Sequence, residues 1–96
     1  MKVKALKSIR DEIDTIDKQV VDLISKRAKL VHSTVAYKES KDEILTNDRI
    51  EEVIALIRKE AISKEISPNM LDDVYRILMD YMLEMEINEF NNKNIF

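Results

Sequence analysis

The sequence contains no glycine and no cysteine, and it has only one proline and one histidine among its 96 residues. Phosphate-binding loops and dinucleotide-binding turns need backbone conformations that glycine adopts at low cost, so both are excluded. The absence of cysteine excludes disulfides and thiolate chemistry. No uninterrupted apolar run reaches the roughly 20 residues that a membrane-spanning helix requires. We therefore expect no transmembrane segment and a cytoplasmic location.

The composition is that of a soluble globular chain. Hydrophobic residues make up 45% of the sequence and charged residues 36%, with a formal net charge of −3. Ninety-six residues suit one domain, residues 1–96. Lysine and arginine are interspersed with acidic residues rather than gathered into a basic face, which argues against a nucleic-acid partner.

Apolar residues recur at alternating intervals of three and four along the first third of the chain. This spacing is typical of a helix with one buried stripe, and no glycine or proline interrupts it. It predicts one very long helix over about residues 4–39, roughly 50 Å in length. The stripe consists of Leu6, Ile9, Ile13, Ile16, Val20, Leu23 and Leu30, and the step between the last two falls on Arg27.

Two shorter helices follow. The first is predicted over about 48–62, with Thr46 or Asn47 as its N-cap. The second is predicted over about 68–91, where Ser67 is the N-cap and Pro68 takes the first helical position. Since no alternating strand pattern is present, the sequence predicts an all-α fold with three helices. The short helices cannot cover the whole stripe of the long one, so we expect an intertwined antiparallel homodimer.

Three cations on the long helix are candidate ligands for an anion. Arg27 interrupts the apolar stripe, and the planar guanidinium suits a partly buried carboxylate. Lys38 lies eleven residues further on and would share its face in a continuous helix. Arg10 is roughly 25 Å from Arg27 along such a helix. An antiparallel dimer would instead bring Arg10 to the site of the partner subunit.

These residues resemble the all-helical, type II chorismate mutases over about residues 5–90. The resemblance rests on the segment "IRDEIDTIDKQVVDLISKR" and the "AYK" that ends at Lys38, then on "DRIEEVI" and "YMLEMEINEF". It implies an intertwined dimer of three-helix chains that converts chorismate to prephenate, on the route to phenylalanine and tyrosine. It also implies no metal and no cofactor, because the reaction is an intramolecular rearrangement.

The resemblance assigns roles to particular residues. Arg27, and Arg10 from the partner chain, would bind the two carboxylates of chorismate. Lys38 would contact a carboxylate and the ether oxygen, and Arg49 would add positive potential. Glu86 would face the ether oxygen from the last helix.

The sequence departs from the best-known bacterial members at several substrate-binding positions. Ile50 stands where a glutamate accepts a hydrogen bond from the ring hydroxyl, and either Glu51 or Glu52 could replace that carboxylate. Met82 replaces a serine and is expected at the pocket wall. The expected aspartate falls on Thr46, although Asp48 lies nearby.

The fourth departure is Glu86, where many members carry glutamine. Glutamate donates a hydrogen bond only when it is protonated. Glu86 would share a face with Met79, Met82 and Phe90, and burial there would raise its pKa. The apolar Ile50 also leaves an isochorismate-pyruvate lyase of salicylate synthesis as an alternative. A second alternative is a helical dimerisation module without catalysis, and the sequence does not indicate whether the chain is allosterically regulated.

Overall fold

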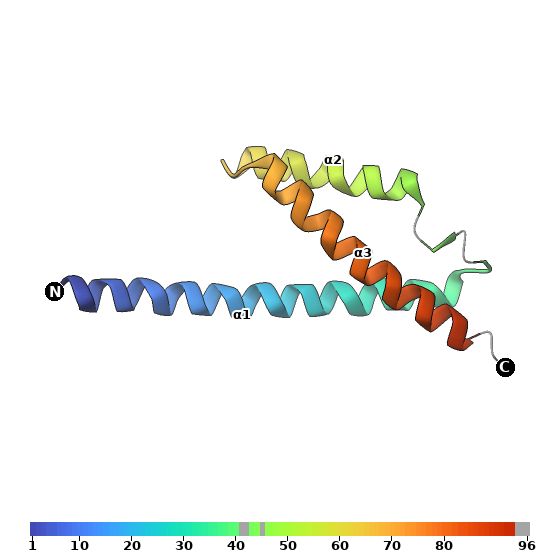
Figure 1. Ribbon diagram of the computed structural model, residues 1–96, viewed down its shortest axis with the longest axis horizontal. Helices are drawn as coiled ribbons and strands as arrows, with labels where there is room; N and C mark the ends of the chain where they lie inside the picture. Colours follow the sequence, from blue (N-terminus) through green and yellow to red (C-terminus); the bar gives the residue numbers. More distant parts are fainter. Residues whose placement is uncertain (41–42, 45, 94–96) are drawn as a thin grey trace. The chain divides into compact units, whose positions relative to one another are not determined.

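The computed structural model describes residues 1–40, 43–44 and 46–93, and this part of the chain is all-α, as predicted (Figure 1). The α-helices are α1 (Lys2–Thr34), α2 (Asn47–Ser63) and α3 (Pro68–Lys93). A 3-10 turn, η1 (Val35–Tyr37), follows directly on α1. Within the described residues, every helix is too short or too polar to cross a membrane.

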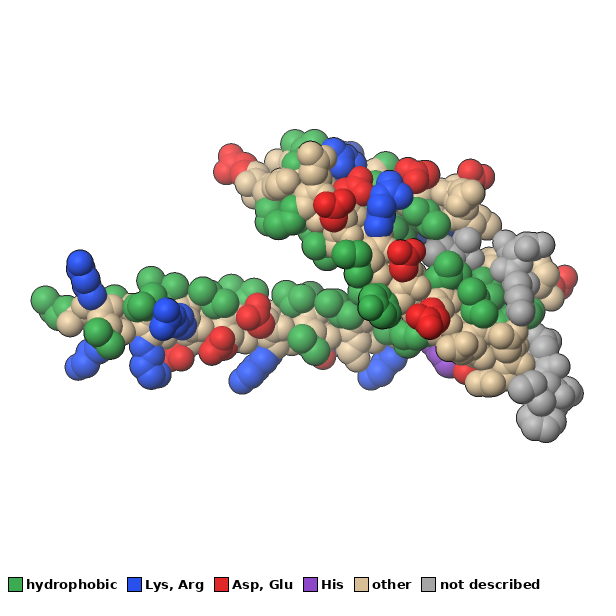
Figure 2. All heavy atoms as spheres, in the orientation of Figure 1, with side chains coloured by type: hydrophobic (Ala, Val, Ile, Leu, Met, Phe, Trp, Pro, Cys, Tyr) green, Lys and Arg blue, Asp and Glu red, His purple; other side chains and the backbone are tan. Residues whose placement is uncertain are grey.

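Most of α1 forms a structural unit of its own, Met1–Leu30. The helix has 33 residues and buries none of them. Its predicted apolar stripe is exposed, from 46% at Val20 to 70% at Leu30. Figure 2 shows hydrophobic side chains along one edge of the long helix and lysine and arginine side chains along the other. An apolar face of this length in water requires a covering surface.

The end of the first helix differs from the prediction, which placed it near residue 39. The α-helix ends at Thr34 and tightens into η1. The hydroxyl of Thr34 donates a hydrogen bond to the carbonyl of Val31 at 2.6 Å. Val35 is 1% exposed and packs in a cluster with Ile44 and Phe90. Burial of Val35 against α3 therefore accompanies the change from an α-helix to a 3-10 turn.

Both shorter helices begin at the predicted capping residues. The hydroxyl oxygen of Thr46 accepts a hydrogen bond from the backbone N–H of Arg49 at 3.2 Å. The hydroxyl oxygen of Ser67 accepts one from the backbone N–H of Met70 at 3.1 Å. Each bond satisfies a donor that has no partner within the first turn of a helix.

The turn between α2 and α3 contains a residue in the left-handed backbone conformation, and this residue is not glycine. Glu65 has φ of 58°, in the region that glycine usually occupies after a helix. The backbone N–H of Ile66 donates to the carbonyl of Ala61 at 3.0 Å, and that of Glu65 donates to Ile62 at 3.1 Å. These two bonds form a Schellman motif, which offsets the steric cost of the left-handed residue.

The unit Val31–Phe96 holds the apolar core, and α3 contributes to both of its clusters. Met79 packs with Val53 and Ile54 of α2. Phe90, three turns further along, packs with Val35 and Ile44. One face of α3 thus fixes the position of α2 and of η1.

An ion-pair network connects α2 to α3 beside this core. Asp72 accepts hydrogen bonds from Arg58 on α2 at 2.9 Å and from Arg76 on α3 at 2.6 Å. Arg58 also donates to the side-chain oxygen of Asn69 at 2.9 Å. Arg76 forms a further ion pair with Glu51 at 3.3 Å. The hydrogen bond from Arg76 is the main reason that the pKa of Asp72 lies below its ordinary value of 3.8.

Asp72 should make the stability of the fold depend on acid pH. Its pKa is lower in the folded than in the unfolded chain, so its contribution is complete above the unfolded-state value. That contribution is lost as the pH falls through the lower, folded-state value. We expect Asp72→Asn to lower the urea midpoint at neutral pH and to reduce the loss of stability in acid. Circular dichroism of urea unfolding between about pH 7 and pH 3 measures both effects.

Asp73→Asn is the matched control, because Asp73 is the exposed neighbour on the same helix. This variant changes the net charge equally and should keep the wild-type midpoint. Equal midpoints for the two variants at every pH would contradict a structural role for Asp72.

Candidate functional site

The candidate residues are divided between the two units. Arg10 and Arg27 belong to Met1–Leu30 and the others to Val31–Phe96. Arg10 is exposed, whereas Arg27 is half-buried. Their separation of seventeen residues on one continuous helix corresponds to roughly 25 Å. The two guanidinium groups of one chain therefore cannot bind the same small molecule.

Lys38 does not lie on the helical face predicted for it. It follows η1 with an extended backbone, φ −93° and ψ 134°, and its N–H donates to the carbonyl of Val35 at 3.1 Å. The argument that placed Lys38 on the face of Arg27 assumed a continuous α-helix to residue 39, and that assumption is wrong. Lys38 is half-buried, and its position is set by the adjacent burial of Val35.

The first turn of α2 presents three candidate residues in sequence. Asp48 is exposed at the helix N-terminus, where a negative charge is favourable. The side chain of Arg49 is 60% exposed. Ile50 is half-buried and packs against the cluster of Val53, Ile54 and Met79. The start of α2 thus displays a cation toward solvent and an apolar side chain toward α3.

The two glutamates that could replace the missing carboxylate make different contacts. Glu51 pairs with Arg76 of α3 at 3.3 Å. Glu52 accepts a hydrogen bond from the Nη1 atom of Arg49 at 2.7 Å. Glu51 is therefore part of the ion-pair network between α2 and α3. Glu52 instead contacts Arg49, the candidate substrate-binding arginine.

Met82 and Glu86 lie one turn apart on the buried face of α3. Met82 is 4% exposed and Glu86 is 6% exposed. The predicted neighbours Met79 and Phe90 are buried on the same face. The prediction that Glu86 is buried among these residues is confirmed. Glutamate is seldom as buried as this unless it has a partner.

Some polar contacts were not predicted from the sequence. Asp72 and Arg76 have the helical spacing of four that favours an ion pair, and this signal was available. The pair of Arg58 with Asp72 depends on how α2 packs on α3. His32 lies 3.6 Å from Glu89, again across elements that are distant in sequence. The side chain of His32 is exposed.

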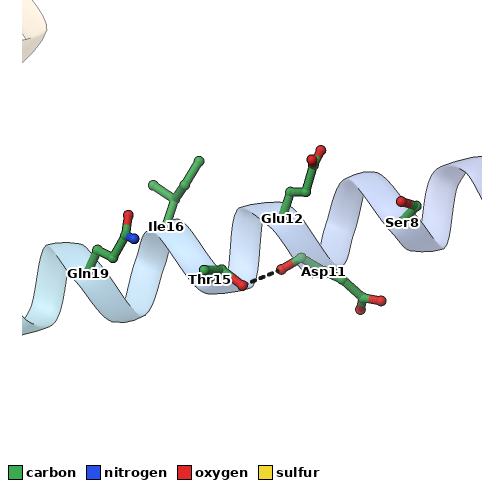
Figure 3. A pocket seen from close by; sticks show the side chains of 6 residues that line it. All are labelled: Ser8, Asp11, Glu12, Thr15, Ile16 and Gln19. Carbon is green, nitrogen blue, oxygen red and sulfur yellow. Dashed lines mark hydrogen bonds between the residues drawn. The ribbon is translucent and has the colours of Figure 1, made fainter.

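Two hollows in the described part of the chain lie away from the candidate residues. One follows α1 and is lined by Ser8, Asp11, Glu12, Thr15, Ile16 and Gln19 (Figure 3). Two of these are carboxylates, and one of them, Asp11, pairs with Lys7 at 3.0 Å. The other, of about 370 Å³, is lined by His32, Ser33, Val35, Ala36 and Glu89.

The candidate residues suit electrostatic catalysis on an anion. They supply cations on α1, after η1 and at the start of α2, together with a buried carboxyl group on α3. The described residues include no group of three or more histidine, aspartate or glutamate side chains that could hold a metal ion. Cationic and hydrogen-bonding groups can position an anion and stabilise charge that develops in a transition state.

Comparison with known proteins agrees with the all-helical fold. A profile of the family described as chorismate mutase type II matches residues 9–87. The chain is 35% identical to a T-protein of Enterobacter agglomerans over 78 residues, which is 80% of this chain and 21% of that protein. It is 32% identical to the T-protein of Haemophilus influenzae over 94 residues, 97% of this chain and 25% of that protein. No solved structure gives a significant match.

The chain belongs to the type II chorismate mutase family, because the match covers most of its length. It spans about a fifth to a quarter of the length of the curated relatives it matches. The resemblance inferred from the residues is therefore confirmed at the level of the family.

Proposed function

We propose that the chain catalyses the rearrangement of chorismate to prephenate in phenylalanine and tyrosine biosynthesis. The observation that carries this proposal is the family match over residues 9–87. The reaction breaks the ether C–O bond and forms a C–C bond within one molecule, so no atom is gained or lost. It needs neither a nucleophile nor an obligatory proton transfer. A single domain over residues 1–96 and a cytoplasmic location are parts of the same proposal.

The transition-state stabilisation that this reaction needs can be supplied by a few charged and hydrogen-bonding side chains. Even a rate enhancement at the low end for enzymes needs about 8 kcal/mol of transition-state stabilisation. One preorganised donor typically contributes about 3–4 kcal/mol. Several converging cations and one donor at the ether oxygen are therefore sufficient, provided that they also hold the compact conformer of the substrate.

The working form in this proposal is an intertwined antiparallel homodimer with chorismate bound by both chains. The exposed stripe of α1 supports it, since Lys2–Thr34 buries no residue within its own chain. Arg10 and Arg27 of one chain are too far apart to share a site, which supports the proposal that Arg10 contributes to the site of the partner subunit. The two arginines would then bind the two substrate carboxylates from different subunits.

The residues with the remaining proposed roles lie in the unit Val31–Phe96. Lys38 would contact a carboxylate and the ether oxygen, and Glu86 would donate a hydrogen bond to that oxygen. The buried position of Glu86 next to Met82 supports its place at the pocket wall, and its carboxyl group can donate only when it is protonated. Arg49 would add positive potential, while Asp48, Ile50 and Met82 would border the substrate.

A second candidate activity is the elimination of pyruvate from isochorismate. Ile50 favours it, because this side chain packs into the apolar cluster of α2 and α3 and offers no acceptor to a ring hydroxyl. The reaction needs the same two carboxylate contacts and a related pericyclic geometry. The two substrates differ in where the hydroxyl stands on the ring, which is the group that position 50 would face.

Assays of the purified chain with chorismate and isochorismate separately test the choice of reaction. We expect prephenate from chorismate and no release of pyruvate from isochorismate. Pyruvate release alone would favour the lyase. Failure to turn over either compound, together with failure to bind a bicyclic diacid analogue of the transition state, would indicate a dimerisation module without catalysis.

Arg27→Ala should lower kcat by about 10²- to 10³-fold, the typical effect of removing one preorganised donor. Lys26→Ala is the matched control, because Lys26 is the exposed neighbour that pairs with Asp22. It should retain nearly wild-type kcat. Steady-state absorbance assays of chorismate consumption measure both, and similar losses in the two variants would contradict a specific role for Arg27.

Mixing Arg27→Ala with Arg10→Ala tests whether the site is shared between chains. Each mixed dimer would contain one site with both arginines intact and one with neither. Random exchange should therefore restore about a quarter of wild-type activity. Activity that stays at the level of the separate variants after unfolding and refolding the mixture would rule out the sharing of Arg10.

Glu86 should make the activity increase as the pH falls, since only the protonated carboxyl group donates a hydrogen bond. Glu86→Gln offers a donor at every pH and should flatten the profile of kcat between acid and neutral pH. Glu84→Gln is the control, because Glu84 is exposed on the same helix. A wild-type profile that is already flat would contradict the role proposed for Glu86.

A further inference from the structure

Arg49 already has an anionic partner within its own helix. Its Nη1 atom donates to the Oε1 atom of Glu52 at 2.7 Å, a short, charge-assisted hydrogen bond. The spacing of three residues keeps both side chains on one face of α2. The backbone N–H of Arg49 is fixed by Thr46, so the base of the side chain is held while the guanidinium extends into solvent.

We infer that Glu52 is a positioning residue that competes with the dianionic substrate for Arg49 and so weakens substrate binding. This inference rests on the proposed function. The carboxylate of Glu52 has the same chemistry as the substrate carboxylates, and it accepts a hydrogen bond from the Nη1 atom of Arg49. A substrate carboxylate that approaches this side of the guanidinium must share or displace this contact.

The neighbouring Glu51 distinguishes a specific effect of Glu52 on Arg49 from a general effect of acidic residues. Glu51 has the same charge and lies on the same helical turn, but its partner is Arg76 of α3 at 3.3 Å. Arg76 is held in turn by Asp72 at 2.6 Å. Glu51 is thus drawn toward the network between the helices, whereas Glu52 acts on Arg49.

The size of the effect follows from the exposure of the pair. The side chains of Arg49 and Glu52 are 60% and 69% exposed. Ion pairs as exposed as this one shift an equilibrium by about 1.5- to 5-fold. Glu52→Gln removes the charge and keeps the shape, so it should lower KM for chorismate by about 2- to 5-fold. It should leave kcat nearly unchanged, because the released binding is available to substrate and transition state alike.

The experiment compares four variants with the wild type: Glu52→Gln, Glu51→Gln, Arg49→Ala and the double variant of Arg49→Ala with Glu52→Gln. Steady-state kinetics with chorismate give KM and kcat, and calorimetric titration of the bicyclic diacid gives Kd without turnover. We expect Glu52→Gln to lower KM and Kd, and Glu51→Gln to leave both unchanged. In the Arg49→Ala background, Glu52→Gln should have no effect on either quantity.

Three outcomes would overturn the inference. An unchanged or higher KM and Kd in Glu52→Gln would mean that Glu52 does not compete for Arg49. An equal decrease in Glu51→Gln would indicate net charge alone. A decrease that persists in the Arg49→Ala background would show that Glu52 acts without Arg49.

The proposed function can fail independently. A wild-type chain that binds the diacid but does not rearrange chorismate would contradict the proposed activity, while Kd would still test Glu52. A chain that does not bind the diacid, either as wild type or as Glu52→Gln, would contradict both.

Discussion

The buried face of α3 is the constraint on which the unit Val31–Phe96 depends. Met79 on this face packs with the core residues of α2, and Phe90 packs with Val35 of η1. These contacts orient α2 and fix the chain just before Lys38. Glu86 lies on the same face between Met79 and Phe90. The same packing that builds the core therefore buries an acidic side chain.

A buried carboxyl group and exposed cations have opposite energetic consequences. Burial of Glu86 costs solvation of the charged form, whereas the exposed Arg10 and Arg49 keep theirs. In the proposed function the cations would bind carboxylates and the acid would donate to an ether oxygen, so the proposal uses both features.

Much of the local structure could be predicted from the residues. Alternating intervals of three and four indicated the helices. Ser67 was correctly identified as an N-cap, and Thr46 was one of the two N-caps considered for α2. The shared face of Met79, Met82, Glu86 and Phe90 was also predicted, and all four are buried. The end of the first helix was not, because Val35 leaves the α-helix in order to pack against residues that are distant in sequence.

The sequence by itself determined the helices, their caps, the apolar stripe of α1 and the chemical character of each candidate side chain. These follow from local hydrogen bonding and from the helical repeat, which act between residues close together in the chain. Only the tertiary structure decided the pairing of Asp72 with Arg58, the packing of Ile50 and the extended backbone at Lys38. Those depend on the register of α3 against α2 and η1, which no local pattern specifies.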